Sequence, residues 1–115
     1  MGNIAYDKSF EYALEIMKLT KELKSKQEYE VAKQLLRSGT SIGANISESE
    51  YAQGKADFVS KLSIALKEAN ESRYWLKLLS ATKEIDEEKA KALIVKAEEI
   101  IRILTASIKT SKNRS

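Results

Sequence analysis

The chain contains no cysteine, no histidine and no proline, and only four of its 115 residues are glycine. Without cysteine it has no disulfide bond, no thiolate nucleophile and no cysteine-ligated zinc or iron–sulfur cluster. Without histidine it lacks the commonest general base and the commonest transition-metal ligand. Serine triads, zinc hydrolases and histidine-dependent ribonucleases are therefore excluded. The sequence predicts a protein that is not an enzyme, with no cofactor and no small-molecule substrate.

The rest of the composition favours helix. Hydrophobic residues make up 43% and charged residues 32% of the chain, and the absence of proline removes the strongest helix breaker. The longest apolar runs are four-residue stretches such as Ala92–Val95, far short of the roughly 18 residues that span a bilayer. The first residues lack the basic and apolar segments of a signal peptide. We therefore expect a cytoplasmic all-α domain with no membrane partner.

Apolar residues recur at helical spacing in four segments, which predicts helices over residues 6–23, 27–52, 55–83 and 86–110. Short connections between long helices favour antiparallel neighbours, so we expect one up-down-up-down four-helix bundle covering residues 1–115.

Polar residues at the expected helix ends supply the caps. Asp7 is expected to cap the first helix and Asp86 the fourth, each with a side-chain oxygen that accepts an unpaired backbone N–H. Ser25 and Glu28 have the spacing of a capping box before the second helix. Gly54 is expected to end the second helix in a left-handed conformation.

The apolar stripes predict which side of each helix is buried. The stripe of the first helix comprises Phe10, Ala13, Leu14, Met17, Thr20 and Lys21, and it is broadened by Ile16, Leu19 and Leu23. The second and third stripes comprise Ala32, Leu35, Leu36, Gly39, Ile42, Gly43, Ile46, Phe58, Leu62, Ala65, Leu66, Ala69, Leu76 and Leu79. The fourth comprises Ala90, Leu93, Ile94, Ala97, Ile100, Ile101, Ile103, Leu104 and Ile108. This last stripe covers more than half of its helix, which indicates a homo-oligomer interface.

Two glycines lie on the apolar face of the second helix. Gly39 and Gly43 are four residues apart, and each costs about 1 kcal/mol relative to alanine inside a helix. We interpret them as sites of close packing against a neighbouring helix. Two tolerated glycines, or a kink between them, are the alternatives.

A polar stripe borders the same apolar face. Arg37, Ser41, Asn45 and Glu48 share one side of the second helix. The third helix carries a matching row, which consists of Ile64, Glu68, Glu71, Trp75 and Leu78. Antiparallel packing would bring Arg37, Ser41 or Asn45 against Glu68 and Glu71 in a structural polar network. The alternative is that both glutamates face solvent.

Carboxylates inside a helical bundle also raise the possibility of a di-iron or di-manganese enzyme. Such sites use Glu-x-x-His pairs, whereas the segment from Glu68 to Glu71 has the spacing but ends in glutamate. We therefore predict no metal site, and elemental analysis distinguishes the two readings.

The positive charge is concentrated at one end of the chain. The formal net charge is +3, and the last fourteen residues contain four basic residues and no acid: Arg102, Lys109, Lys112 and Arg114. We interpret residues 109–115 as a basic tail. This tail is either an ordinary solvated terminus or a contact for nucleic acid.

Two segments resemble the signatures of a known family. The run from Arg37 to Glu48, RSGTSIGANISE, and the block from Asp57 to Leu76 resemble a four-helix-bundle family encoded in intervening sequences of bacterial large-subunit ribosomal RNA genes. The resemblance covers nearly the whole chain.

The resemblance implies a small non-enzymatic bundle that forms a ring-shaped homopentamer. A related branch resembles the accessory subunit of diversity-generating retroelements, which binds a reverse transcriptase and structured RNA. On this basis we expect a homo-oligomeric scaffold or adaptor whose partner is RNA or an RNA-handling protein. A purely structural protein–protein interaction module is the alternative.

Overall fold

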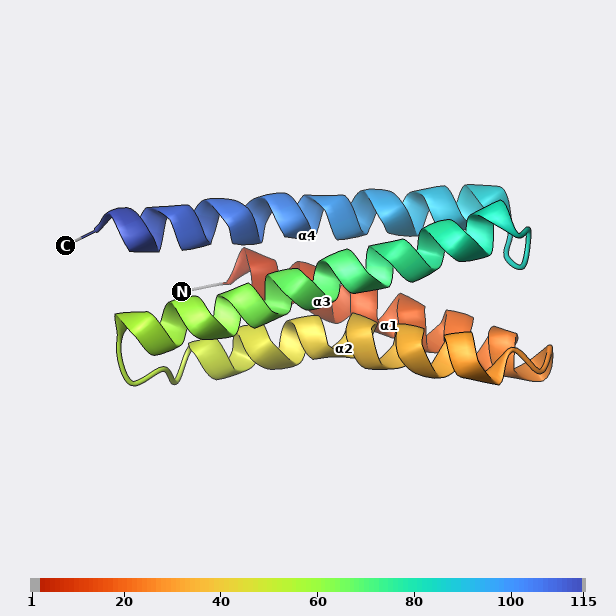
Figure 1. Ribbon diagram of the computed structural model, residues 1–115, viewed down its shortest axis with the longest axis horizontal. Coiled ribbons are helices and arrows are strands. Elements are labelled where there is room, and N and C mark those ends of the chain that lie inside the picture. Colours follow the sequence, from red (N-terminus) through yellow and green to blue (C-terminus); the bar gives the residue numbers. More distant parts are fainter. Residues whose placement is uncertain (1–2, 115) are drawn as a thin grey trace.

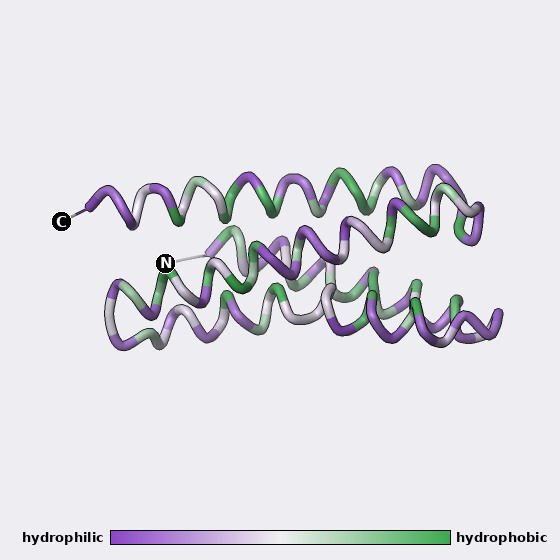
Figure 2. The backbone as a smooth tube through the Cα atoms, viewed as in Figure 1, coloured by the Kyte–Doolittle hydropathy of each residue, from purple (hydrophilic) through white to green (hydrophobic). Residues whose placement is uncertain are grey.

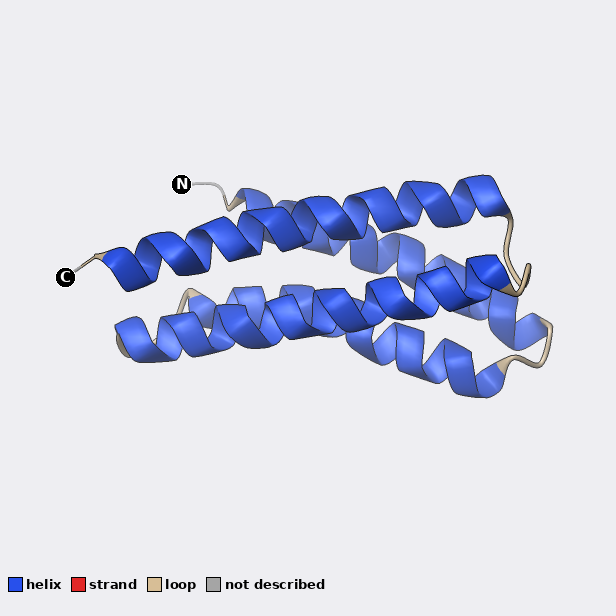
Figure 3. Ribbon diagram, turned by 45° about the horizontal axis from the view of Figure 1, so that its top comes forward, coloured by secondary structure: helices blue, strands red, loops and turns tan. Residues whose placement is uncertain are grey.

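The computed structural model describes residues 3–114 and contains four helices: α1 (Ile4–Ser25), α2 (Tyr29–Ser49), α3 (Lys55–Ala81) and α4 (Glu87–Asn113). Each helix runs antiparallel to the next, and both chain ends lie at the same end of the bundle (Figure 1). Short loops join the helices (Figure 3), and contacts link α1 to α2, α2 to α3, α3 to α4 and α4 to α1. The predicted all-α four-helix bundle is therefore confirmed.

The bundle measures 50 × 22 × 20 Å. Within residues 3–114, no helix is both long enough and apolar enough to cross a membrane. Apolar residues recur at intervals along each helix (Figure 2), as expected when one side faces the interior.

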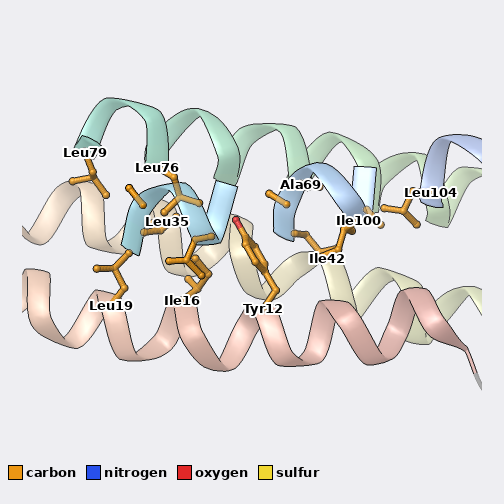
Figure 4. Close-up of a cluster of buried hydrophobic side chains, with 14 of the residues drawn as sticks. Tyr12, Ile16, Leu19, Leu35, Ile42, Ala69, Leu76, Leu79, Ile100 and Leu104 are labelled. Carbon is orange, nitrogen blue, oxygen red and sulfur yellow. The ribbon is translucent and has the colours of Figure 1, made fainter. Parts of the chain in front are cut away.

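The core runs along the length of the bundle and is filled by side chains from all four helices (Figure 4). At its centre Tyr12 of α1 points into the interior, and its hydroxyl lies 2.8 Å from the hydroxyl of Ser72 on α3. Burial raises the pKa of Tyr12 to about 12, against the smaller opposing effect of the Ser72 hydrogen bond. The phenol is therefore neutral at physiological pH.

The predicted apolar face of the first helix is only partly right. Phe10, Leu14 and Met17 are exposed, whereas the members that broadened the stripe are buried together with two residues that were not predicted. The buried row consists of Ala5, Tyr12, Ile16, Leu19 and Leu23. Both sides of α1 are apolar, so helical periodicity could not select between them. The predicted stripes of α2 and α3 do face the core: most of their members are buried, and Leu36, Gly43, Phe58 and Leu66 are partly buried.

The cap of α1 differs from the predicted one, whereas the cap of α4 is the predicted residue. Asn3, not Asp7, caps α1, because its side-chain oxygen accepts the N–H of Tyr6 at 3.0 Å. Asp7 lies in the first turn, where its negative charge interacts favourably with the positive end of the helix dipole. Asp86 caps α4 as predicted and accepts the N–H of Lys89 at 3.1 Å.

The predicted capping box and the predicted role of Gly54 are also wrong. Ser25 is still part of α1, where it donates to the carbonyl of Glu22, and Glu28 makes no side-chain capping bond. The α2 helix ends at Ser49, and Gly54 instead precedes α3 in an extended conformation. Among residues 3–114, two non-glycine residues take the left-handed conformation: Gln27 after α1 (φ 65°) and Lys83 after α3 (φ 62°).

Glycine at either left-handed position should stabilise the protein. Gln27→Gly or Lys83→Gly removes the steric cost of a β-carbon at positive φ, for an expected gain of about 0.5 kcal/mol. Denaturant unfolding measures the change. The control is Lys24→Gly within α1, which should lose about 1 kcal/mol. A loss of stability at both Gln27 and Lys83 would contradict the prediction.

The broad apolar stripe of α4 is largely accommodated within one chain. Ala90, Leu93, Ala97, Ile100 and Leu104 are buried. The remaining isoleucines, Ile94, Ile101, Ile103 and Ile108, are partly buried against the core. Exposed large apolar side chains are therefore more numerous on α1, with Ile4, Phe10, Leu14 and Met17, than on α4, with Val95. The structure also extends α4 to Asn113, so most of the predicted basic tail is helical.

Candidate functional site

The two polar stripes meet between α2 and α3, with Arg37 between two glutamates. The guanidinium of Arg37 donates to Glu68 at 3.0 Å and also to Glu71. The indole N–H of Trp75 donates to the Glu71 carboxylate at 3.1 Å. The guanidinium, both carboxylates and the indole N–H of this cluster thus all form hydrogen bonds with one another.

The other predicted members of the network lie on the same side but do not join it. Ser41 donates to the Arg37 carbonyl at 2.6 Å, and Asn45 donates to the Ser41 carbonyl at 2.9 Å. Glu48 pairs instead with Lys61 of α3 at 3.2 Å, a partner that the sequence analysis did not include. Short side chains that bond within their own helix cannot reach across to the next one.

The glutamates are more covered than their partner. The side chain of Glu68 is 13% exposed and that of Glu71 29%, while Arg37 is 48% exposed. Burial alone would raise the pKa of Glu71, but hydrogen bonds from Trp75 and Arg37, together with the charges of Arg37 and Lys67, lower it below the usual value. The hydrogen bond to Glu71 likewise raises the pKa of Arg37. Glu71 and Arg37 therefore stay ionised at neutral pH.

Stability should depend on pH through Glu71. Its pKa is lower in the folded chain than in the unfolded chain, where it is about 4.3. The stabilising contribution is therefore complete above about pH 4.3 and is lost as pH falls through the lower folded-state pKa. We expect the stability advantage of the native protein over Glu71→Gln to shrink in acid. Denaturant unfolding from neutral to acidic pH measures it, with Glu11→Gln as the control; equal slopes for both variants would contradict the prediction.

The arrangement suits a structural role. Within residues 3–114, no group of three or more acidic residues is placed to hold a metal ion. The carboxylates of Glu68 and Glu71 already accept hydrogen bonds from Arg37 and Trp75. What the cluster can do is hold α2 and α3 in one register.

The two glycines of α2 lie against α1. A β-carbon built on Gly39 would come within 2.8 Å of Ile16 Cγ2, closer than real carbon atoms approach. One built on Gly43 would lie 3.0 Å from the hydroxyl of Ser9. The geometry thus brings the α2 backbone close to α1 at both positions, in line with the close-packing interpretation.

The four basic residues near the C-terminus are exposed and lie on or directly after α4. Arg102 and Lys109 are seven residues apart and so lie on the same side of the helix. None of the four forms an ion pair within the part of the chain that the structure describes. The backbone carbonyl of Arg114 accepts a hydrogen bond from Lys55.

An apolar surface that the sequence pattern did not predict lies between α1 and α2. Phe10, Leu14 and Met17 are 45–52% exposed and line a groove of about 370 Å³. Small residues on α2 form its other side: Thr40, Gly43, Ala44 and Ser47. The signal was present in the sequence, since apolar residues occupy two sides of the first helix. We name Phe10, Leu14 and Met17 the α1 apolar face.

Comparisons with known proteins agree with the fold. A family model described as "23S rRNA-intervening sequence protein" matches residues 2–106. A crystal structure from Bacteroides thetaiotaomicron, described as a protein with unknown function from the S23 ribosomal protein family, is 50% identical in sequence. The match covers 91% of this chain and 98% of that one, with a TM-score of 0.89. A comparison with curated proteins gave no match.

Proposed function

Because the chain belongs to the family of 23S rRNA-intervening sequence proteins, we propose that it is a non-catalytic scaffold that works as an assembly of identical subunits. One observation carries the proposal: the α1 apolar face exposes three large side chains along a groove. Contiguous exposed apolar surface on a small protein marks an interaction site. The structurally similar protein, itself described as having unknown function, offers no competing activity.

The number of subunits follows only from the family resemblance, which implies a ring of five. The mass of the native protein in solution, measured by light scattering, tests the proposal directly. We expect a single species several times heavier than the 12.9 kDa chain. A mass of one chain at all concentrations up to millimolar would overturn it.

The exposed basic residues of α4 favour a second function, contact with structured RNA, either alone or together with an RNA-handling protein such as a reverse transcriptase. Arg102, Lys109, Lys112 and Arg114 carry no acidic partner among residues 3–114. An assembly would bring several such clusters together, so weak contacts would add. This function would place the protein in the cytoplasm.

Salt dependence tests the RNA contact. Binding to a structured RNA should weaken steeply as salt rises, because each neutralised phosphate releases counterions. The variant Lys109→Ala, Lys112→Ala, Arg114→Ala should bind more weakly and with a shallower slope. A variant with the same charge loss elsewhere, Lys77→Ala, Lys83→Ala, Lys91→Ala, is the control. Equal binding by the two variants would exclude the C-terminal cluster as the contact.

A further inference from the structure

The outer side of α1 carries an ordered row of acid, apolar residue and base. Asp7, Leu14 and Lys21 are seven residues apart and therefore lie in line along the helix. All three are exposed, and Leu14 is 47% exposed. Neither Asp7 nor Lys21 forms an ion pair with any residue in the described range. We name these three residues the α1 row.

The outer side of α4 repeats the pattern with the same spacing. Glu88, Val95 and Arg102 are also seven residues apart and exposed, and Val95 is 60% exposed. Glu88 and Arg102, like the charges of the α1 row, have no ion-pair partner among residues 3–114. We name these residues the α4 row.

The two rows are complementary when the helices lie antiparallel. Since a helix rises 1.5 Å per residue, both rows space their members by about 10 Å. Asp7 then lies opposite Arg102, Leu14 opposite Val95, and Lys21 opposite Glu88. Within one chain this pairing is impossible, because α1 and α4 already turn other residues toward each other: Glu15 pairs with Lys96, and Glu22 with Lys89. A second copy of the chain carries a complementary row that is free to make this pairing.

We propose that subunits associate head to tail, the α1 row of one copy packing antiparallel against the α4 row of the next. This inference rests on the proposed self-association and specifies its surfaces. Because the two surfaces differ, each copy contacts one neighbour through its α1 row and the other neighbour through its α4 row. Such contacts repeat from copy to copy until a ring closes. Arg102 then serves assembly, while Lys109, Lys112 and Arg114 lie beyond the paired row.

Side-chain size favours this pairing over two symmetric ones. The charges would also match if two α1 rows, or two α4 rows, met antiparallel. Two α1 rows would oppose large side chains to large ones, since Phe10 and Met17 flank Leu14. Two α4 rows would oppose small to small, since the exposed apolar residue one turn from Val95 is Ala92. Large residues against small ones pack more closely.

Mixing two single variants separates the three arrangements. Leu14→Glu disables the α1 row, and Val95→Glu disables the α4 row. Both side chains are exposed, so each variant should keep the subunit fold, which circular dichroism checks. Each variant alone should have the mass of one chain. An equimolar mixture should form a complex of two chains, because one intact row of each kind remains.

Other outcomes overturn the inference. If only Val95→Glu still assembles, two α1 rows meet; if only Leu14→Glu still assembles, two α4 rows meet. Assembly by both variants would place the interface elsewhere and leave the proposed self-association standing. A native protein with the mass of one chain would instead remove the proposed function itself.

Charge reversal tests the register. Lys21→Glu should weaken self-association about fivefold, the scale of one exposed ion pair. Adding Glu88→Lys in the same chain should restore it, whereas adding Asp7→Lys should not. Lys77→Glu on α3 is the control and should leave association unchanged. Rescue by Asp7→Lys alone would contradict the register, because it requires two α1 rows to meet.

Discussion

Replacing Gly39 with leucine is expected to destabilise the bundle by about 3 kcal/mol, at the upper end of the cost of overpacking a core. The β-carbon alone would lie 2.8 Å from Cγ2, 3.1 Å from Cγ1 and 3.3 Å from Cβ of Ile16. Ile16 is fully buried and cannot move aside, so α1 and α2 must separate. Denaturant unfolding measures the loss as a lower transition midpoint.

Smaller changes at the same contact establish the cause. Gly39→Ala should cost about 1 kcal/mol despite the better helix propensity of alanine. In the double variant Gly39→Ala, Ile16→Ala the clashing carbons are absent, so the combined loss should be smaller than the sum of the single losses. Gly54→Ala is the control, because nothing lies within 4 Å of its added carbon. Additive losses would show that Gly39 does not pack against Ile16.

Arg37→Ala is expected to cost about 2 kcal/mol, less than the 3–5 kcal/mol of a fully buried ion pair because the guanidinium is half exposed. The loss arises mainly from Glu68 and Glu71, which would be left as neighbouring negative charges with little access to water. Glu71→Ala should cost less, since Arg37 keeps Glu68 as its partner.

Neutralising the stranded carboxylates should recover the loss. The variant Arg37→Ala, Glu68→Gln, Glu71→Gln should regain most of the stability, and its unfolding should depend less on pH. Lys61→Ala, which breaks the exposed pair with Glu48, is the control and should cost at most about 0.5 kcal/mol. An equal loss for Lys61→Ala and Arg37→Ala would reduce the cluster to an ordinary surface ion pair.

The cluster between α2 and α3 shows what pattern reasoning can reach. Arg37, Glu68 and Glu71 were placed together because each lies on a polar row beside an apolar stripe, and neighbouring antiparallel helices bring such rows into contact. The hydrogen bond from Trp75 and the pairing of Glu48 with Lys61 do not follow from the pattern. These contacts depend on the distance between two helices and on the length of the side chains. The spacing of residues along one helix does not give that distance.

Helix ends were predicted less well than helices. Asn3 and Asp7 can both cap a helix, and local sequence does not say which one starts it. Gln27 and Lys83 end their helices in a left-handed conformation that local sequence does not predict, because glycine is the usual residue there and neither position has it. Tertiary packing of the flanking helices accounts for such positions, since it outweighs a local cost of about 1–2 kcal/mol.

By itself, the sequence determined that this is a helical bundle, because periodic apolar residues, the absence of proline and short connections admit few other folds. It also determined most of the buried faces of α2 and α3, because the members of their apolar stripes are largely buried. Only the tertiary structure decided which side of α1 enters the core. Both sides are apolar enough, and the choice depends on shape: Ile16 fits against the bare backbone of Gly39, while Phe10, Leu14 and Met17 are left outside.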